Sequence, residues 1–416
     1  MAKLRLGIVG CGSITQRGLL PHLFQPDARA RAEVVALCTR TVPRARRVAE
    51  AYGIGQVFGD LAEMLNWGGL DAVLIASPID LHFEQVKASL ERGLHVHTQK
   101  TLAQTFCEGE LLSQLARAKG VVLAVSPGQA LLPAYAHVRS LIQDQWVGAI
   151  YGAWGVNVVW GHERDPLVQD PAWYYRPGGG PLADMGIYNL HALIDLLGVP
   201  QRVSAMIGQP MPEKQAGERT VRVEIADNVC LMMDWGGGVL GTLSTAYAYE
   251  PELLRWGHLA IVGNRGTIEI RKSPTQLGRY EVVTRSDGGV ETAYFDQSLP
   301  PEHECMEEGH VYLDVRDFVD AILQGRSPRA SAETACAALA VIDAVTESAA
   351  TGRSVSLATA EGLFYHGHTV LTGFEDGFTT RQFGKGPECF HQFFHPILDG
   401  HLRAVIQLGE LADIAH

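Results

Sequence analysis

Residues 4–125 alternate short, continuously apolar runs with amphipathic stretches. The apolar runs are "LRLGIVG", "AEVVALC", "DAVLIAS", "LHVHT" and "KGVVLAVSPG". Helical periodicity fills the gaps, for example from Ile14 to about Phe24 and from Val42 to a stop at Gly53. Continuous apolar strands separated by helices are typical of a parallel sheet covered on both faces. We therefore predict an α/β fold with a doubly wound parallel sheet over residues 1–127, whose ligands would bind at the carboxyl ends of the strands.

The pattern changes after Gln129. A helix is predicted over about 131–146, followed by the strand "AIYGAWGVNVVW", a Pro/Gly-rich loop over 161–180 and a helix over 181–197. Between about 202 and 297 the period-two runs have the length and spacing of a large, mostly antiparallel sheet. Two helices follow, near 311–324 and 332–350. These elements predict a second α/β domain over 128–355 and a less periodic C-terminal extension over 356–416.

A glycine-rich turn lies between the first strand and the first helix. Gly10 and Gly12 would permit a tight turn and let backbone N–H groups approach a pyrophosphate at the helix N-terminus. Ser13 and Ile14 follow them and are predicted to contact the same cofactor. The third position of the motif is Thr15, where Gly or Ala is usual, so a purely structural turn is the alternative.

The end of the second strand bears on the choice of cofactor. An acidic residue there would bind the ribose 2′-hydroxyl of NAD. This chain has Thr39 and Arg40 there, with Arg44 nearby, and a hydroxyl with guanidinium groups suits a 2′-phosphate. NADP is therefore the preferred cofactor and NAD the alternative, unless Arg44, Arg46 and Arg47 only line a solvated helix face.

Two further segments carry candidate chemistry. The stretch "HVHTQKTLAQT" is an apolar strand that ends on Lys100 and turns into a helix. In "GGGPLADMGIYNLHALIDLLG", Pro181 suits a first helical turn, and Asp184, Tyr188 and His191 are spaced to share one face of that helix. Hydrogen-bonded core residues are the alternative interpretation of this polar stripe.

These side chains suit the oxidation of a secondary alcohol. Hydride transfer to a nicotinamide requires a base for the hydroxyl proton. The pKa of tyrosine is near 10, and a neighbouring ammonium group lowers it. We predict Tyr188 as the acid/base, and Lys100 as its electrostatic partner and a donor to the substrate oxygen. Asp184 would orient the substrate or the lysine, and His191 would contact the substrate or serve as an alternative base.

The sequence resembles the Gfo/Idh/MocA family of oxidoreductases over most of residues 3–355. The resemblance is carried by "GIVGCGSIT", "DAVLIASPIDLH", "LERGLHVHTQK", "GGGPLADMGIYNLHALIDLLG" and "IVGNRGTIEI", in that order, and by the late helical pair. It implies an N-terminal Rossmann domain, an active site between the domains, and a C-terminal α/β domain whose open sheet often mediates oligomers. A homodimer or homotetramer is therefore expected.

The resemblance also implies roles for individual residues. Lys100 matches the family lysine beside the nicotinamide, while its neighbours Gln99 and Thr101 replace a glutamate and a proline. Tyr188 replaces the usual histidine and is similar to the tyrosine of the glucose–fructose oxidoreductase and the dihydrodiol or xylose dehydrogenase branches. His191 stands where the family often has Asp or Asn. Three residues from one strand end are expected on the cofactor side: Ser77, Pro78 and His82, the last with a helix-cap role as the alternative.

The loop before the candidate helix is aromatic and basic. It offers a set of rings and donors that suits a sugar or cyclitol: Trp160, His162, Arg164, Trp173, Tyr174 and Arg176. Apolar ring faces and a polar rim match the two surfaces of such a substrate. The predicted substrate site consists of the loop residues other than His162 together with Asp184 and His191, and an ordinary aromatic cluster at an interface is the alternative.

Bulk properties exclude several classes of function. The net charge of −12 argues against nucleic-acid binding. Seven scattered cysteines without a C-x-x-C pair are typical of reduced thiols in a cytoplasmic protein. A strand starts almost at the first residue, so no signal peptide is expected, and no apolar run is long enough to predict a membrane span. The extension contains several histidines without a zinc-like spacing, so no metal site is predicted: His366, His368, His391, His395 and His401.

Three functions stay open at this point. The first is an NAD(P)-dependent dehydrogenase acting on a sugar, sugar derivative or cyclitol. The second is a glycoside-cleaving enzyme that uses a retained NAD(P) for transient oxidation and elimination. The third is a cofactor-binding regulator without catalysis, which would need the pocket but not Lys100, Asp184 and Tyr188. Fold alone does not separate them.

Overall fold

The computed structural model describes residues 3–165, 168, 170–248, 257–272, 278–304 and 306–357. All of them belong to one compact unit that spans residues 1–368. The predicted extension over 356–416 and its five histidines lie outside the described residues, apart from the first two positions.

The N-terminal sheet has six strands in the order β3-β2-β1-β4-β5-β6, and every neighbouring pair is parallel. The strands are β1 (Leu4–Val9), β2 (Ala32–Cys38), β3 (Gln56–Phe58), β4 (Ala72–Ile75), β5 (His95–Thr98) and β6 (Leu123–Val125). β4 and β6 are buried along their whole length, as expected for strands covered on both faces. The predicted doubly wound parallel sheet is confirmed, and this strand order is that of a Rossmann fold.

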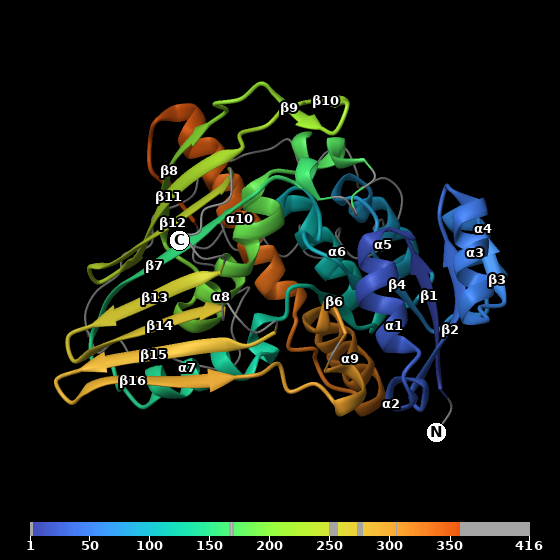
Figure 1. The fold of residues 1–416 in the computed structure, drawn as a ribbon, viewed down its shortest axis with the longest axis horizontal. Coiled ribbons are helices and arrows are strands. Elements are labelled where there is room, and N and C mark those ends of the chain that lie inside the picture. Colours follow the sequence, from blue (N-terminus) through green and yellow to red (C-terminus); the bar gives the residue numbers. More distant parts are fainter. Residues whose placement is uncertain are drawn as a thin grey trace, which may run out of the picture. The chain divides into compact units, whose positions relative to one another are not determined.

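Helices cover both faces of this sheet (Figure 1). On one face the core includes side chains of α1 (Leu20–Leu23), α2 (Pro26–Arg29) and α3 (Val42–Tyr52). On the other it includes side chains of α4 (Leu61–Trp67), α5 (His82–Glu91) and α6 (Phe106–Lys119). The sequence sets where α6 begins and ends, because Thr105 and Glu108 form a capping box and Gly120 ends the helix at φ 64°.

The second sheet has nine strands in the order β16-β15-β14-β13-β7-β12-β11-β8-β17. All neighbours are antiparallel except β7 and β12, which run parallel. The predicted, mostly antiparallel sheet is thus confirmed. Its strands are β7 (Ile150–Val159), β8 (Arg202–Gly208), β11 (Asn228–Gly236), β12 (Val239–Tyr247), β13 (His258–Gly263), β14 (Gly266–Lys272), β15 (Tyr280–Ser286), β16 (Gly289–Phe295) and β17 (Val355–Ser356). A separate hairpin consists of β9 (Glu213–Ala216) and β10 (Arg219–Arg222).

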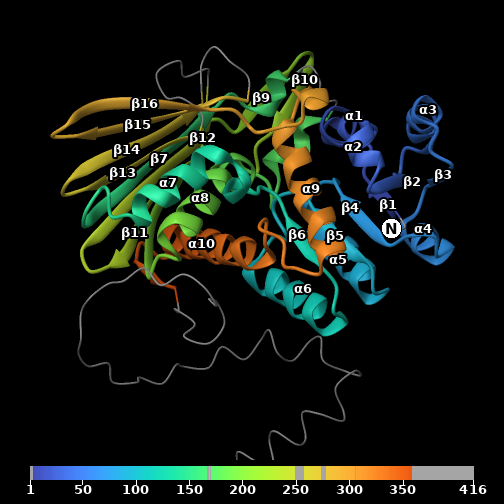
Figure 2. The same ribbon diagram turned by 90° about the horizontal axis from the view of Figure 1, so that it is seen from below.

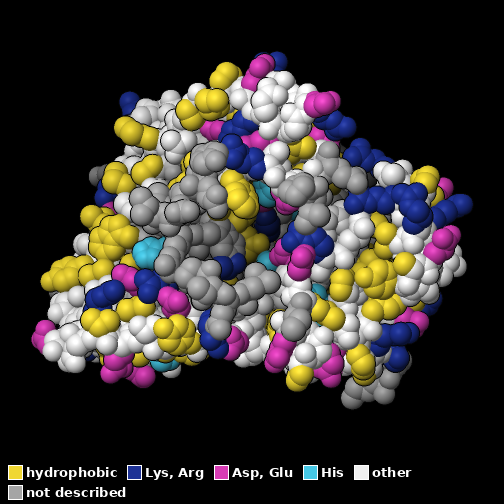
Figure 3. Space-filling model, in the orientation of Figure 1, with side chains coloured by type: hydrophobic (Ala, Val, Ile, Leu, Met, Phe, Trp, Pro, Cys, Tyr) yellow, Lys and Arg dark blue, Asp and Glu magenta, His cyan; other side chains and the backbone are white. Residues whose placement is uncertain are grey.

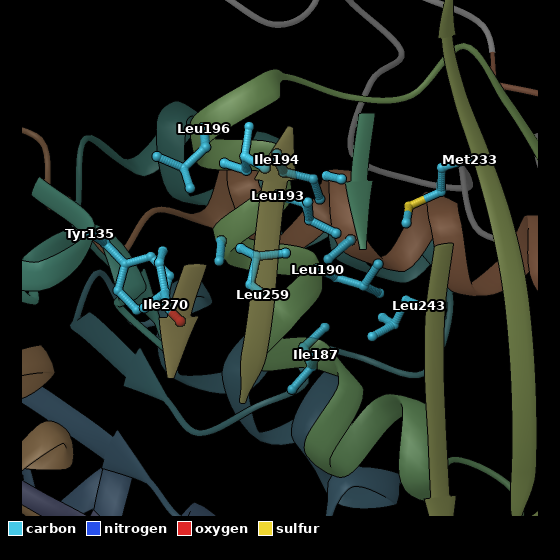
Figure 4. Close-up of a cluster of buried hydrophobic side chains, with 14 of the residues drawn as sticks. Tyr135, Ile187, Leu190, Leu193, Ile194, Leu196, Met233, Leu243, Leu259 and Ile270 are labelled. Carbon is cyan, nitrogen blue, oxygen red and sulfur yellow. The ribbon is translucent and has the colours of Figure 1, made fainter. Parts of the chain in front are cut away.

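Helices α7 (Pro133–Gln143), α8 (Ile187–Leu197) and α10 (Ala332–Thr351) lie on one face of the large sheet (Figure 2). Apolar side chains of α8 point between the sheet and α10 (Figure 4), among them Leu190, Leu193 and Ile194. α7 is shorter than the predicted helix over 131–146. The helix predicted over 181–197 begins with a π-helical turn, η6 (Leu182–Gly186), before α8.

Two C-terminal helices complete the core of the N-terminal domain. Val311, Val315 and Phe318 of α9 (Gly309–Gln324) lie in one of its apolar clusters, and Leu339 of α10 lies in the other. The opposite side of α10, including Val341, packs in the core of the second domain. The boundaries 1–127 and 128–355 stay predictions.

Helix α10 also has the composition of a membrane span. Among the described helices it alone has the length and mean hydropathy for one, 1.2 over an 18-residue window, and half of that window is buried inside the protein. Core helices of globular proteins pass the same test, so the finding is weak support for a span.

Because Phe318 is fully buried although it comes from the C-terminal part of the chain, Phe318→Ala is expected to destabilise the protein by about 3–5 kcal/mol. Denaturant unfolding followed by circular dichroism measures the effect. Met206→Ala is the control, because Met206 is 82% exposed and surface changes usually stay within about 0.5 kcal/mol. Equal stability of the two variants would contradict this assignment of the core.

Candidate active site

Lys100 connects the two domains. It follows β5 at the carboxyl edge of the parallel sheet, and its peptide bond to Thr101 is cis. The Lys100 ammonium donates to the carboxylate of Asp184 and, at 2.8 Å, to the main-chain oxygen of the same residue. The lysine is only 16% exposed and the aspartate 1%, so the two charges form a largely buried ion pair.

Asp184 is shared by three donors. Besides Lys100, the Asp184 Oδ2 atom lies 2.6 Å from His162 Nε2 and accepts a hydrogen bond of 2.7 Å from the Tyr247 hydroxyl. Burial alone would raise the pKa of Asp184, but Lys100 and His162 outweigh it and hold that pKa well below its usual value. Asp184 is therefore a fixed negative charge that orients its neighbours.

The only parallel strand pair described in the large sheet brings these residues together. β7 and β12 end side by side, with Val159 opposite Tyr247. β7 continues into a short 3-10 helix, η4 (His162–Arg164), while Tyr247 is the last residue of β12. Thr245 then fixes the start of the candidate helix by donating to the Pro181 carbonyl at 3.1 Å. Carboxyl ends of parallel strands again provide the site, as in the first sheet.

Tyr188 lies close to Lys100, with the lysine Nζ 5.7 Å from the centre of its ring. Its hydroxyl is 3.4 Å from His310 Nε2. Burial, followed by the carboxylates of Glu308 and Asp184, raises the pKa of Tyr188 well above its ordinary value. The structure thus reverses the predicted direction: the ammonium of Lys100 is neutralised by Asp184, so burial decides and the phenol stays protonated at neutral pH.

His191 follows Tyr188 by three residues within α8, and its side chain is buried. Its Nδ1 atom lies 3.0 Å from the Pro127 carbonyl, and burial lowers its pKa to about 4. The predicted role of His191 as a substrate contact or alternative base stays a prediction. His191 is a buried neutral group that positions the loop after β6.

His82 is fully buried beneath the cofactor edge. Its Nδ1 lies 2.6 Å from the Thr101 carbonyl and its Nε2 2.9 Å from the Ser77 carbonyl. The ring therefore ties the loop that carries Lys100 to the end of β4. Both nitrogens are engaged by the main chain, so the structure gives His82 a positioning role in place of the predicted contact with the cofactor.

The glycine-rich turn fits a dinucleotide. Gly10 has φ +95°, and a Cβ atom there would lie 2.4 Å from the Ala76 carbonyl, whereas a Cβ on Gly12 would meet nothing within 4 Å. The chain is thus closed behind the turn and open in front of it, where Ser13 and Ile14 begin the helix. Thr15 donates to the Gly10 carbonyl at 2.8 Å, which gives the unusual third residue a structural role.

The residues predicted to select the cofactor lie beside this turn. Thr39 and Arg40 follow β2, and the Arg40 side chain is exposed. Arg44 on α3 is close enough to the turn to lower the pKa of Cys11, against the larger opposing effect of burial. Ser77 donates to Gln85 at 2.5 Å, and Pro78 precedes a short 3-10 helix.

Of the aromatic loop that precedes the candidate helix, only some side chains lie at Asp184. His162 stacks on Tyr174 with ring centres 3.5 Å apart, and Trp173 stacks on the same tyrosine at 3.6 Å. The Tyr175 hydroxyl donates to Glu163 and holds the loop. Trp160 is 53% exposed, and Arg164 and Arg176 are exposed as well. Figure 3 shows one face of the molecule with a hollow near its centre and with basic and histidine side chains beside the hollow.

Sequence reasoning missed two residues of the site and underused a third. Nothing in the sequence pointed to Tyr247 or His310, because Tyr247 is the last residue of an ordinary strand and His310 is the second residue of a helix far along the chain. His162 was noted only among the rings and donors of the aromatic loop. No group of three potential metal ligands exists within the described ranges, where four cysteines are free thiols: Cys11, Cys38, Cys230 and Cys336.

Comparison with known proteins identifies the family. Residues 4–126 match the oxidoreductase family's NAD-binding Rossmann fold, and residues 156–357 match its C-terminal alpha/beta domain. The chain belongs to the Gfo/Idh/MocA family and is an NAD(P)-dependent oxidoreductase.

Its relatives act on sugars. The chain is 27% identical over 326 residues to dTDP-3,4-didehydro-2,6-dideoxy-alpha-D-glucose 3-reductase of Streptomyces antibioticus, covering 78% of this chain and 90% of that one. It is 25% identical over 358 residues to D-xylose 1-dehydrogenase (NADP(+)) 2 of Haloferax volcanii, covering 85% and 100%. The structure of levoglucosan dehydrogenase with NADH and levoglucosan has the same fold, with a TM-score of 0.73 at 22% identity, covering 85% and 99%.

We expect Asp184→Asn to destabilise the protein by about 3–5 kcal/mol at pH 7, because a buried ammonium loses its partner. The folded-state pKa of Asp184 is depressed, so its contribution is complete above the unfolded value and is lost as the pH falls below about 4. Urea unfolding of both proteins between pH 3 and pH 8 should show the difference shrinking at the acid end.

Glu91→Gln is the matched control, because Glu91 pairs with Lys87 on an exposed helix face and such pairs contribute about 0.3–0.5 kcal/mol. A difference between wild type and Asp184→Asn that stays constant down to pH 3 would contradict the depressed pKa.

Proposed function

We propose that this protein interconverts a secondary alcohol and a ketone on a sugar or sugar derivative, with Tyr188 as the acid/base and Lys100 as the group that holds the reacting oxygen. The observation that supports this proposal is that the Lys100 ammonium, at the carboxyl edge of the cofactor sheet, lies 5.7 Å from the centre of the Tyr188 ring and is held by Asp184. When bound, the nicotinamide cofactor supplies or accepts the hydride.

Lys100 is oriented to serve a substrate oxygen. An ammonium group has three N–H bonds, and within the described residues two of them are directed to Asp184. The third is left for the oxygen on which negative charge develops as the hydride moves. Because Asp184 fixes the lysine before substrate arrives, this donor is preorganised, which is the arrangement that stabilises a transition state.

Tyr188 is suited to donate a proton. Burial keeps its phenol protonated at neutral pH, so in the reducing direction it gives its proton to the ketone oxygen as the carbon receives the hydride. In the oxidising direction it must take the hydroxyl proton while losing its own. The raised pKa therefore favours reduction of a ketone over oxidation of an alcohol, in line with the reductases among the relatives.

The aromatic loop supplies a substrate surface. The stacked rings of His162, Tyr174 and Trp173 stand beside Asp184, and flat rings with polar edges suit the two surfaces of a sugar. Exposed Arg164 and Arg176 lie on the same loop and would contact substituents of the sugar. Relatives named for xylose and for a deoxyglucose nucleotide support this substrate class.

To test these roles, we expect Tyr188→Phe and Lys100→Met to lower kcat/KM by about 10²–10⁴-fold, as removal of an acid/base or an oxyanion donor does. Turnover is measured by nicotinamide absorbance on a panel of sugars, keto sugars and glycosides. Tyr151→Phe and Lys87→Met are the matched controls, since Tyr151 is exposed on β7 and Lys87 on α5.

Near-normal turnover of both variants would refute the assignment. Glycoside cleavage with no net reduction of the cofactor would instead favour the transient-oxidation enzyme, and absence of turnover on every substrate would favour the regulator.

We propose NADP as the preferred cofactor. The proposal is supported by Thr39 and Arg40 at the end of β2 and by Arg44 nearby on α3.

Arg40→Ala is expected to weaken NADP binding about tenfold to a hundredfold, because a charge-assisted hydrogen bond contributes about 1.5–3 kcal/mol. NAD binding should be unchanged. Isothermal titration of both cofactors measures this. Arg47 is exposed on α3, the helix that carries Arg44, and Arg47→Ala should change the affinity for neither cofactor. An equal loss of affinity for NAD and NADP in Arg40→Ala would argue against a 2′-phosphate site.

A further inference from the structure

A short chain of polar side chains leads from Tyr188 toward solvent. The Tyr188 hydroxyl lies 3.4 Å from His310 Nε2, and His310 Nδ1 lies 3.7 Å from Glu308 Oε2. The side chains of His310 and Glu308 are 20% and 23% exposed. The chain thus begins at the candidate acid/base and ends at a carboxylate that water reaches.

The backbone and a neighbouring arginine hold Glu308 in this place. Glu308 has φ 56°, in the left-handed region, immediately before α9. Its other carboxylate oxygen lies 3.3 Å from Arg17 on the helix after the glycine-rich turn. The same arginine also pairs with Glu307. Glu308 is therefore anchored on the cofactor side while it faces His310.

The surroundings of His310 keep its ring neutral. The groups that face it are Tyr188 on α8, Glu308 before α9, Lys272 on β14, Lys100 after β5 and His22 on α1. Burial, together with the positive charges of Lys272 and Lys100, lowers the pKa of His310 to about 3. A neutral imidazole has one donor and one acceptor nitrogen, so it can take a proton on one side and release one on the other.

We propose that His310 and Glu308 form a proton relay that exchanges the proton of Tyr188 with solvent. This inference rests on the proposed function, in which Tyr188 is the acid/base.

The bond changes balance in both directions. During alcohol oxidation, Tyr188 takes the substrate proton and gives its own to His310 Nε2. Because 3.7 Å is longer than a hydrogen bond, the Nδ1 proton of the ring passes through a bridging water to the Glu308 carboxylate, which releases it to solvent. During ketone reduction the same bonds change in reverse. The starting tautomer of His310 is restored by exchange with water.

Three variants separate a relay from a packing role. His310→Phe keeps an aromatic ring against Tyr188, His310→Ala leaves space for a small buffer molecule, and Glu308→Gln keeps the side-chain shape without a proton acceptor. We expect each to lower kcat about tenfold or more, with KM and the cofactor dissociation constant within twofold of wild type. The solvent deuterium isotope effect on kcat should increase, and added imidazole should restore most of the turnover of His310→Ala.

Matched controls are His137→Phe on α7 and Glu304→Gln, which is exposed; neither should change kcat, and thermal melts check that every variant folds. The relay is overturned if the three relay variants keep the wild-type kcat. It is also overturned if kcat falls but imidazole does not rescue His310→Ala, or if kcat falls and the isotope effect does not increase.

The Tyr188→Phe variant distinguishes this failure from that of the proposed function. If Tyr188→Phe turns over normally, the acid/base assignment fails. If Tyr188→Phe is inactive but the His310 and Glu308 variants are normal, only the relay fails.

Discussion

The ion pair between Lys100 and Asp184 is the interaction on which the rest of the site depends. Two charges taken out of water are stable only when their remaining donors and acceptors are satisfied. Here His162 and Tyr247 complete the hydrogen bonds of the carboxylate. Because the lysine comes from the first domain and the other three residues from the second, the pair fixes the domains against each other at the point where substrate and cofactor must meet.

Around this pair, the side chains of buried histidines contact main-chain carbonyl groups of the loops and hold these loops in place. His82 ties the Lys100 loop to the end of β4, and His191 holds the Pro127 carbonyl after β6. The same loop is held from beneath by Asp314, which accepts hydrogen bonds from Ser126 and the Gly128 amide. Burial raises the pKa of Asp314 to about 7. Lys100 thus stands on loops whose polar groups are already paired, so it needs little rearrangement when substrate binds.

The sequence predicted those parts of the protein that depend on local pattern. Strands buried on both faces must be apolar throughout, so the parallel sheet could be predicted from the sequence. Gly10 marked the phosphate turn, because only glycine fits against the Ala76 carbonyl. The contacts that depend on long-range pairing could not be predicted in this way. Nothing local reveals that β7 and β12 run parallel within an antiparallel sheet, which is why the role of Tyr247 was missed.

The two C-terminal helices have a consequence for synthesis of the chain. Val125 ends the last strand of the N-terminal sheet, but Phe318 and Leu339, which cover its two faces, come about two hundred residues later. At about 5–20 residues per second on the ribosome, that interval is roughly 10–40 s. During it the nascent N-terminal domain exposes apolar surface on both sides of a parallel sheet. Until α9 and α10 have been made, this uncovered apolar surface can make non-native contacts, and transiently exposed apolar surface promotes aggregation.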